Sequence, residues 1–377
     1  MIRIKRELQD KIIKKLQPNK VIVITGARRV GKTFLLKEII SGLASDHLFL
    51  NGEDINTHLL LEKRSAENYR YIIGSKKIVI IDEAQKIPEI GSILKLIVDE
   101  IEGIGIIITG SSAFDMTNLT GEPLVGRKHS FVLHPLSVKE QAQVETPLIQ
   151  SDRLEHRLIY GNYPELLHID DNLSKQEYLN DIISSYLLRD ILSFENIRNS
   201  SKIFNLLRLI SFQIGSQVSF HELGKQLGIS KNTVEKYLDL LSKVFIIFKI
   251  EGFSKNLRKE ITKSSKWYFY DNGIRNAVIA NYNMPELRDD SGRLWENFLA
   301  SERIKYQQYK GSAVNNFFWR TYDRQEIDWI EESGGKLNGF EFKNKDKGEK
   351  APAAWTKAYP SASFEVIDRD KYFEWLS

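Results

Sequence analysis

One stretch near the start of the chain restricts the fold more than any other: residues 26–33 read Gly-Ala-Arg-Arg-Val-Gly-Lys-Thr. An apolar, β-branched run over 21–25 precedes it, and the run over 34–40 that follows has apolar residues at helical spacing. A strand, a glycine-bounded loop and a helix in that order form a phosphate cradle, because backbone N–H groups and the helix N-terminus face the anion. The segment predicts a nucleoside triphosphate site in which Lys32 reaches the β- and γ-phosphates and Thr33 ligates Mg²⁺. The loop itself would contribute Gly26, Ala27, Arg28, Arg29, Val30 and Gly31.

A second apolar run, residues 78–81, ends in two carboxylates, Asp82 and Glu83. This pattern is typical of a buried strand in a parallel sheet, and ligands bind at the carboxyl ends of such strands. We expect Asp82 to hold the Mg²⁺ of the nucleotide and Glu83 to polarise the water that attacks the γ-phosphate. The alternative is a strand that leads into a solvated acidic loop.

A third apolar run, residues 104–109, also ends in polar residues. A side chain at that strand end would contact the γ-phosphate or orient the attacking water, and Thr109 and Ser111 are the candidates. Further along, Arg127 would supply a cation to a phosphate, either in this chain or in a neighbouring subunit of a homo-oligomer. The alternative for Arg127 is a solvated basic turn.

These motifs share a family resemblance. The segments 24–33, 81–86, 109–112 and 124–127 resemble archaeal and bacterial AAA-type ATPases that carry an AAA domain and an uncharacterised C-terminal domain. The segment Tyr-Gly-Asn-Tyr-Pro-Glu, residues 160–165, is similar to the Gly-Gly-Tyr-Pro-Glu motif of that family, with an asparagine in place of the second glycine. The resemblance extends over nearly the whole chain and implies ATP as the nucleotide.

The middle of the chain has the pattern of a winged helix. Two helical stretches, with a turn at Gly228 and an N-cap at Ser230 between them, predict a helix-turn-helix. The apolar runs 244–248 and 267–270 would form the strands of the wing. Residues 221–266 hold ten Lys or Arg against five Asp or Glu, which is the charge pattern of DNA backbone binding. Such a domain would alternatively pack on the ATPase and relay its state.

The last ninety residues resemble a PD-(D/E)-x-K nuclease fold. Asp328 interrupts one predicted strand, and Glu341 and Lys343 alternate on the next, so that they share one face. Glu296, on the helix that precedes these strands, would complete the cluster. Asp328 and Glu341 would hold Mg²⁺ to activate a water, while Lys343 would position the nucleophile or stabilise the transition state. The alternative is paired charges on a half-exposed sheet.

The length of 377 residues suits several domains. We expect an α/β AAA-type domain over 1–140, a helical lid over 141–200, a winged helix over 201–275 and an α+β restriction-endonuclease-like domain over 285–377. No apolar run approaches the ~18 residues that span a membrane, the start lacks the apolar core of a signal peptide, and the chain has no cysteine. A cytoplasmic protein is the simplest interpretation.

Two functions follow from this pattern. In the first, ATP turnover controls a metal-dependent nuclease that acts on DNA. In the second, ATP binding drives an assembly switch, and the nuclease-like domain holds nucleic acid or a partner without cutting it.

Overall fold

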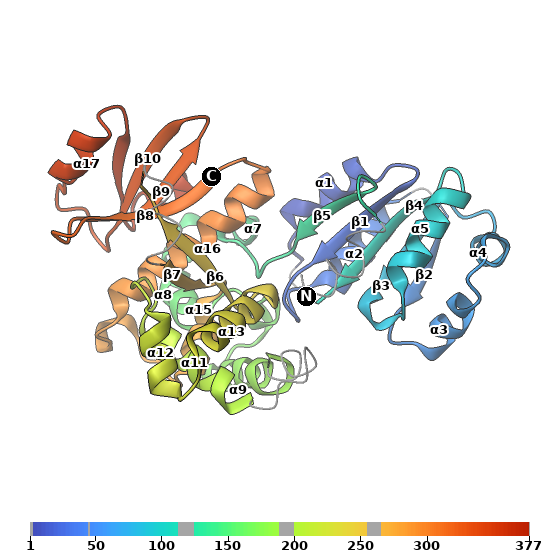
Figure 1. Cartoon of the computed structure of the whole chain (residues 1–377), viewed down its shortest axis with the longest axis horizontal. Helices are drawn as coiled ribbons and strands as arrows, with labels where there is room; N and C mark the ends of the chain where they lie inside the picture. Colours follow the sequence, from blue (N-terminus) through green and yellow to red (C-terminus); the bar gives the residue numbers. More distant parts are fainter. Residues whose placement is uncertain (1–2, 44–45, 112–123, 188–199, 255–264, 377) are drawn as a thin grey trace. The chain divides into compact units, whose positions relative to one another are not determined.

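The structure is a computed structural model that describes residues 3–43, 46–111, 124–187, 200–254 and 265–376. It divides into two compact units (Figure 1). The N-terminal unit consists essentially of Lys5–Pro135, and the C-terminal unit consists essentially of Leu136–Ser377. Each unit is built around one β-sheet.

The N-terminal unit contains a five-stranded parallel sheet with the strand order β2-β3-β4-β1-β5. Strands β1, β3 and β4 match the three predicted apolar runs, whereas β5 was not predicted. The strands are β1 (Lys20–Thr25), β2 (His47–Asn51), β3 (Ile78–Asp82), β4 (Gly105–Gly110) and β5 (Lys128–Val132). The helices are α1 (Glu7–Lys15), α2 (Lys32–Gly42), α3 (Ile55–Glu62), α4 (Ala66–Ile73) and α5 (Ile90–Glu100).

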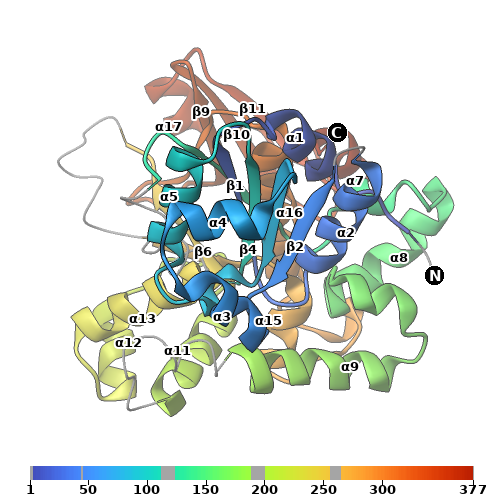
Figure 2. The same cartoon turned by 90° about the vertical axis from the view of Figure 1, so that its right-hand side faces the viewer.

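Helices cover both faces of this sheet. Apolar side chains of α4 and α5 share one core cluster with alternate residues of β1, β3 and β4. Figure 2 shows α1 and α2 on the other side of the strands. This burial on both faces explains why β1, β3 and β4 read as continuous apolar runs rather than alternating ones. The strand order places the end of β4 between the ends of β1 and β3. We call the edge of the sheet at which the carboxyl ends of its strands lie the carboxyl edge.

The C-terminal unit contains a six-stranded mixed sheet with the order β11-β10-β9-β8-β6-β7. Its strands are β6 (Ile247–Gly252), β7 (Ser265–Phe269), β8 (Asn315–Arg320), β9 (Glu326–Ser333), β10 (Lys336–Phe342) and β11 (Ser363–Ile367). Its helices are α7 (Val138–Gln141), α8 (Pro147–Tyr160), α9 (Asn172–Asp181), α11 (Ser200–Phe212), α12 (Phe220–Leu227), α13 (Lys231–Lys243), α15 (Asn272–Val278), α16 (Ser291–Lys310), α17 (Ala353–Ala358) and α18 (Tyr372–Trp375).

The helix-turn-helix prediction corresponds to α12 and α13. Gly228 ends α12 with φ 64°, a left-handed conformation that glycine adopts without a steric penalty. Ser230 then caps α13, since its hydroxyl accepts the Thr233 N–H at 3.1 Å. Both positions agree with the sequence expectation.

The hairpin β6–β7, predicted as a wing, differs from the expectation in what it joins. Glu251 and Gly252 of β6 pair in parallel with Phe317 and Phe318 of β8, so the hairpin continues the sheet of β8–β11 (Figure 1). The boundary expected between residues 275 and 285 therefore does not separate two sheets.

Helix α16 supplies much of the core of this unit. Its apolar side is buried in one core cluster with residues of β7, β8, β9 and β10. Its buried members are Leu294, Trp295, Phe298 and Leu299. Within the described residues, no helix of either unit has the length and apolarity to cross a membrane.

Candidate functional site

The loop between β1 and α2 has the geometry of a phosphate cradle. Gly26 adopts φ 151°, and a Cβ at this position would lie 2.1 Å from the Leu133 carbonyl oxygen, so only glycine fits. Gly31 adopts φ 95° immediately before α2 begins at Lys32. Within the loop, Ala27 and Val30 are buried, Arg28 is half-buried and Arg29 is exposed. The backbone thus turns sharply into the N-terminus of α2, the arrangement that binds anionic oxygens.

Lys32 lies inside this loop. Its ammonium donates hydrogen bonds to the carbonyl oxygens of Gly26 and Ala27, both at 3.0 Å, and the residue is buried. The next residue, Thr33, donates its hydroxyl to Asp82 Oδ2 at 2.7 Å. The structure therefore brings together the two predicted Mg²⁺ ligands of the N-terminal unit, Thr33 and Asp82, from α2 and β3.

Thr109, at the end of β4, connects the two predicted carboxylates. Its buried hydroxyl donates to Asp82 Oδ1 and accepts the Glu83 N–H at 2.9 Å. The hydroxyl therefore orients Asp82 and the backbone of Glu83, and a direct role of Thr109 toward the γ-phosphate or the attacking water stays a prediction. This position follows from the strand order, which sets β4 between β1 and β3.

Glu83 is held by a residue that the sequence reasoning did not assign. Gln85, in the short helix η1 (Ala84–Lys86), donates its amide to Glu83 Oε2 at 2.7 Å and to Ser111 Oγ at 3.1 Å. Glu83 itself adopts φ 50°, an uncommon left-handed conformation for a non-glycine residue. The spacing of Gln85, two residues after Glu83 just beyond a strand, was the available signal. Ser111 thus reaches Glu83 through Gln85.

Arg6 is a second residue that the sequence reasoning missed. It is buried, and its guanidinium donates to the carbonyl oxygens of Val30 at 2.7 Å and His134 at 2.6 Å. Arg6 therefore fixes the backbone of the phosphate loop from outside. No pattern in the sequence around Arg6 indicated this role.

Arg127 does not reach the phosphate site of its own chain. It directly precedes β5, and its carbonyl accepts the N–H of Val21 at the beginning of β1. Because β5 runs parallel to β1, Arg127 lies at the edge of the sheet opposite the carboxyl edge. Its guanidinium pairs with Asp99 of α5. The expectation of a cation supplied within the chain is therefore wrong, and a role toward a neighbouring subunit stays a prediction.

The predicted nuclease-like residues lie close together in the C-terminal unit, but a lysine from β7 stands among them. The Lys266 ammonium is 3.3 Å from Glu296 Oε1, 2.7 Å from Glu326 Oε1 and 3.8 Å from Asp328 Oδ1. Burial lowers the pKa of Lys266, but these three carboxylates outweigh burial and raise it above its ordinary value. Burial raises the pKa of Glu296 to about 7, with Lys266 opposing the shift and Asp328 adding to it.

Glu341 and Lys343 pair with one another beside this cluster. Lys343 Nζ donates to Glu341 Oε1 at 2.7 Å, and Asp328 Oδ2 accepts the Phe342 N–H at 2.9 Å. Burial, together with the charge of Asp328, raises the pKa of Glu341 to about 7. Glu341 Oε2 is buried with no hydrogen-bond partner among the described residues, which is the one feature that a bound cation would complete.

The cluster does not fit the predicted Mg²⁺ site. The described part of the chain holds no group of three or more His, Asp or Glu side chains arranged to bind a metal ion. Mg²⁺ needs oxygen ligands at about 2.0–2.1 Å. One carboxylate oxygen of Glu296 and one of Glu326 are already paired with the Lys266 ammonium. No metal chemistry is therefore assigned to Asp328 and Glu341.

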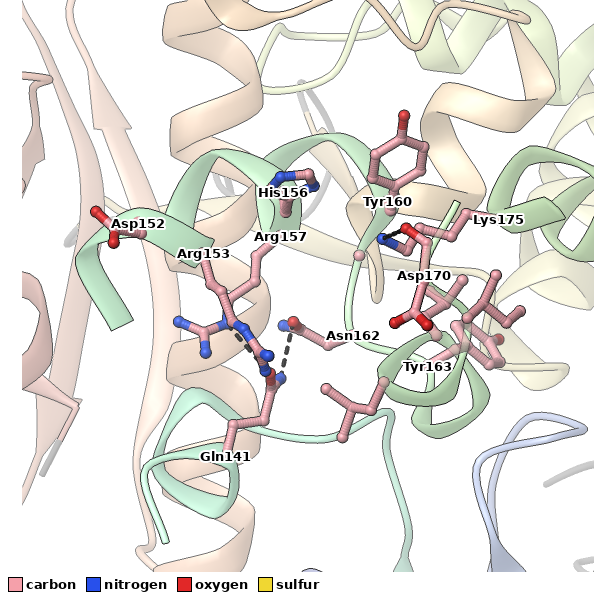
Figure 3. Close-up of a pocket in the computed structure, with 14 residues that line it drawn as sticks. Gln141, Asp152, Arg153, His156, Arg157, Tyr160, Asn162, Tyr163, Asp170 and Lys175 are labelled. Carbon is pink, nitrogen blue, oxygen red and sulfur yellow. Dashed lines mark hydrogen bonds between the residues drawn. The ribbon is translucent and has the colours of Figure 1, made fainter. Parts of the chain in front are cut away.

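Residues 160–163 of the segment 160–165 line a pocket of about 370 Å³ in the C-terminal unit (Figure 3). Asn162 fills the position of the glycine in the related motif, and its side chain accepts from Gln141 at 2.9 Å and donates to Glu302 at 3.1 Å. Arg157 pairs with Glu145 and donates to Gln141 at 3.2 Å. Lys175 donates to the Asp170 carbonyl at 3.3 Å. Arg157 and Lys175 therefore already have partners within the protein, and the residues that line the pocket do not indicate a class of ligand.

Comparison with known proteins agrees with the geometry of the N-terminal unit. Residues 18–142 match the family described as "AAA domain". Residues 151–284 and 291–374 match two families that are each described as a domain of unknown function.

Relatives that align with most of this chain, and a solved structure, have low sequence identity to it. An uncharacterized protein of Mycobacterium bovis is 23% identical over 90% of this chain and 74% of its own length. An uncharacterized protein of Haemophilus influenzae is 27% identical over 82% of this chain and 78% of its own length. The structure of a signal transduction ATPase with numerous domains from Pyrococcus horikoshii aligns with a TM-score of 0.33 and 13% identity, over 82% of this chain and 47% of that chain. The phosphate loop, the acidic strand end and the family match agree with one another: residues 18–142 form an AAA-type P-loop ATPase domain.

Proposed function

We propose that this protein hydrolyses ATP in its N-terminal unit and uses the ATP cycle to control contact with DNA in its C-terminal unit. The observation that carries the ATPase part is a continuous chain of hydrogen bonds from Thr33 through Asp82 and Thr109 to Glu83. This chain connects the phosphate loop to the acid that would act on water. The test is a measurement of phosphate release from ATP. The release is expected to require Mg²⁺ and to be lost in variants of Lys32 and Glu83.

Each residue has a distinct part in this reaction. Lys32 would bind the β- and γ-phosphate oxygens, and the N–H groups of the loop would bind the rest. Thr33 and Asp82 would hold Mg²⁺, which supplies charge neutralisation between the phosphates. Glu83 would accept a proton from the attacking water, and Gln85 would keep its carboxylate at a fixed place until then.

The DNA part of the proposal is supported by the helix pair α12–α13 and the hairpin that follows. On α13, the exposed Lys231 and Lys236 are balanced by the exposed Glu235 and Asp239. Lys266, which the sequence analysis counted in the basic region, is buried and paired. The remaining positive charge of this region lies mainly in 255–264, outside the described residues. We therefore expect the segment 255–264 to carry the contact with the DNA backbone.

Reversing the charge of Lys255, Arg258 and Lys259 together is expected to weaken DNA binding on any sequence. Each lost phosphate contact should also lower the slope of log affinity against log salt by about 0.9 for duplex DNA. Fluorescence anisotropy with labelled duplexes over a range of salt concentrations measures both effects.

The control reverses three lysines that are exposed elsewhere in the C-terminal unit, Lys310, Lys336 and Lys357. Equal loss in both triple variants would mean that only net charge matters. Unchanged binding in the first variant would leave the helix pair a role in relaying the state of the ATPase.

For the C-terminal sheet, we favour a binding module over a nuclease, because Lys266 stands among the carboxylates that a metal would need. Incubation of plasmid and single-stranded DNA with Mg²⁺ or Mn²⁺, with and without ATP, is expected to give equal, background cleavage for the parent and for Asp328→Ala. Cleavage by the parent that disappears in Asp328→Ala would instead support a nuclease at Glu296, Asp328, Glu341 and Lys343.

A further inference from the structure

We propose that the Lys266 ammonium is a built-in cation that takes the place of a divalent metal in the C-terminal sheet, and that its removal lets the surrounding carboxylates, which are not arranged around a metal while it is present, close on a metal ion. The inference rests on the function proposed for this sheet, a binding module that does not cut DNA. It does not depend on ATP hydrolysis in the N-terminal unit.

The first support is the geometry around the ammonium. The carboxylates of Glu296 from α16 and of Glu326 and Asp328 from β9 approach it from two elements that are distant in the sequence from β7. Only 1% of the Lys266 side chain is exposed, and its Nζ lies 5.3 Å from the centre of the Phe318 ring. A lysine is almost never buried to this degree unless its charge is compensated.

The second support is charge balance. Three carboxylates within 4 Å of one point repel one another strongly when they are removed from water, so the cluster needs a cation at its centre. An ammonium supplies three N–H donors and one positive charge from the chain itself. A divalent ion would have to occupy the same space, and like charges a few ångströms apart exclude each other there.

The third support is that the backbone around the cluster is shaped for this arrangement. Gly215 adopts φ 68°, and a Cβ at this position would lie 2.6 Å from Glu296 Oε2. The absence of a side chain at Gly215 therefore leaves room for the Glu296 carboxylate. Tyr268 donates its hydroxyl to the same Glu296 Oε1 that faces Lys266, at 2.6 Å. The space at Gly215 and the hydrogen bond from Tyr268 together orient Glu296 toward the ammonium.

The competing interpretation is that Lys266 is a catalytic lysine that stands beside a bound metal. The two interpretations differ in what the parent protein binds. A built-in cation excludes the metal until the lysine is removed, whereas a catalytic lysine coexists with it.

Mn²⁺ binding to the full-length protein, measured without nucleotide by electron paramagnetic resonance of the free ion, separates them. The parent and Asp328→Asn are expected to bind equal amounts of Mn²⁺, so that any binding in the N-terminal unit cancels in the comparison. Lys266→Met is expected to bind one additional Mn²⁺ per chain, and the double variant with Asp328→Asn is expected to lose it. A matched control, Lys249→Met, removes a partly exposed lysine of the same hairpin and should gain nothing.

Each result decides between the interpretations. An ion bound by the parent and lost in Asp328→Asn would overturn the proposal, and so would a folded Lys266→Met that gains no ion. If Lys266→Met does not fold without metal, thermal unfolding with added Mn²⁺ replaces the binding measurement: recovery of a cooperative transition supports the proposal, and its absence, with Mn²⁺ binding to the parent at Asp328, refutes it. Phosphate release from ATP is recorded on the same samples, so a failure of the proposed ATPase activity is seen separately.

Discussion

Replacing Lys32 with alanine is expected to lower the affinity for ATP by about 100-fold or more. The ammonium would make at least two charge-assisted hydrogen bonds to phosphate oxygens, each worth about 1.5–3 kcal/mol, and 1.4 kcal/mol corresponds to a factor of ten. In the structure this ammonium lies on the carbonyl oxygens of Gly26 and Ala27, in the middle of the loop. Titration calorimetry with ATP and Mg²⁺ measures the loss.

Lys20→Ala is the matched control for this experiment. Lys20 begins β1, the strand that leads into the phosphate loop, but it lies at the edge of the sheet opposite that loop and donates to the Gly126 carbonyl at 2.8 Å. The control should bind ATP like the parent, and thermal unfolding should show both variants folded. Parental affinity in Lys32→Ala would mean that the loop is not the phosphate site.

Glu83→Gln is expected to leave ATP binding intact and to slow hydrolysis by at least about 100-fold, the usual contribution of a positioned general base. The substitution suits the site, because the amide oxygen of a glutamine can still accept the hydrogen bond from Gln85 Nε2. The loss would therefore reflect chemistry rather than a changed position. Steady-state phosphate release, with binding measured in parallel, gives both quantities.

Glu100→Gln provides the comparison for Glu83. Glu100 is an exposed acid at the end of α5, where it pairs with Arg70 at 3.5 Å. Its turnover should match that of the parent. If Glu83→Gln also turns over at the parental rate, the activating residue must be sought elsewhere on the carboxyl edge.

The N-terminal unit could be predicted in most respects because its signals are local. The loop 26–33 and the strand end at Asp82 and Glu83 lie in short contiguous segments whose residue order already specifies a strand followed by a loop. What could not be predicted is how neighbouring strand ends share their hydrogen bonds. Thr109 was expected to contact the γ-phosphate or to orient the attacking water, and the hydrogen bonds that its hydroxyl makes with Asp82 and Glu83 were not predicted.

The C-terminal unit was harder to predict because its important contacts join distant parts of the chain. Glu296 and Asp328 were recognised from their places on a helix and a strand, but Lys266 was interpreted as one basic residue of a DNA-binding loop. Its burial depends on the pairing of β6 with β8, which no short pattern encodes. The prediction that Arg127 acts within its own chain was wrong for a similar reason. Strand β5 was not predicted, so the edge of the sheet at which Arg127 lies was unknown.

The pairing of β6 with β8 also has a consequence for the order in which the protein is completed during translation. The five strands of the N-terminal unit are all made before residue 136, so this unit can close while the ribosome is still extending the chain. The hairpin β6–β7, by contrast, emerges well before the strands that cover its edge. Until β8 follows, the edge of β6 remains open to other chains, and until β9 follows, Lys266 has neither Glu326 nor Asp328 beside it. The second half of this protein is therefore the part most in need of protection while it is being synthesised.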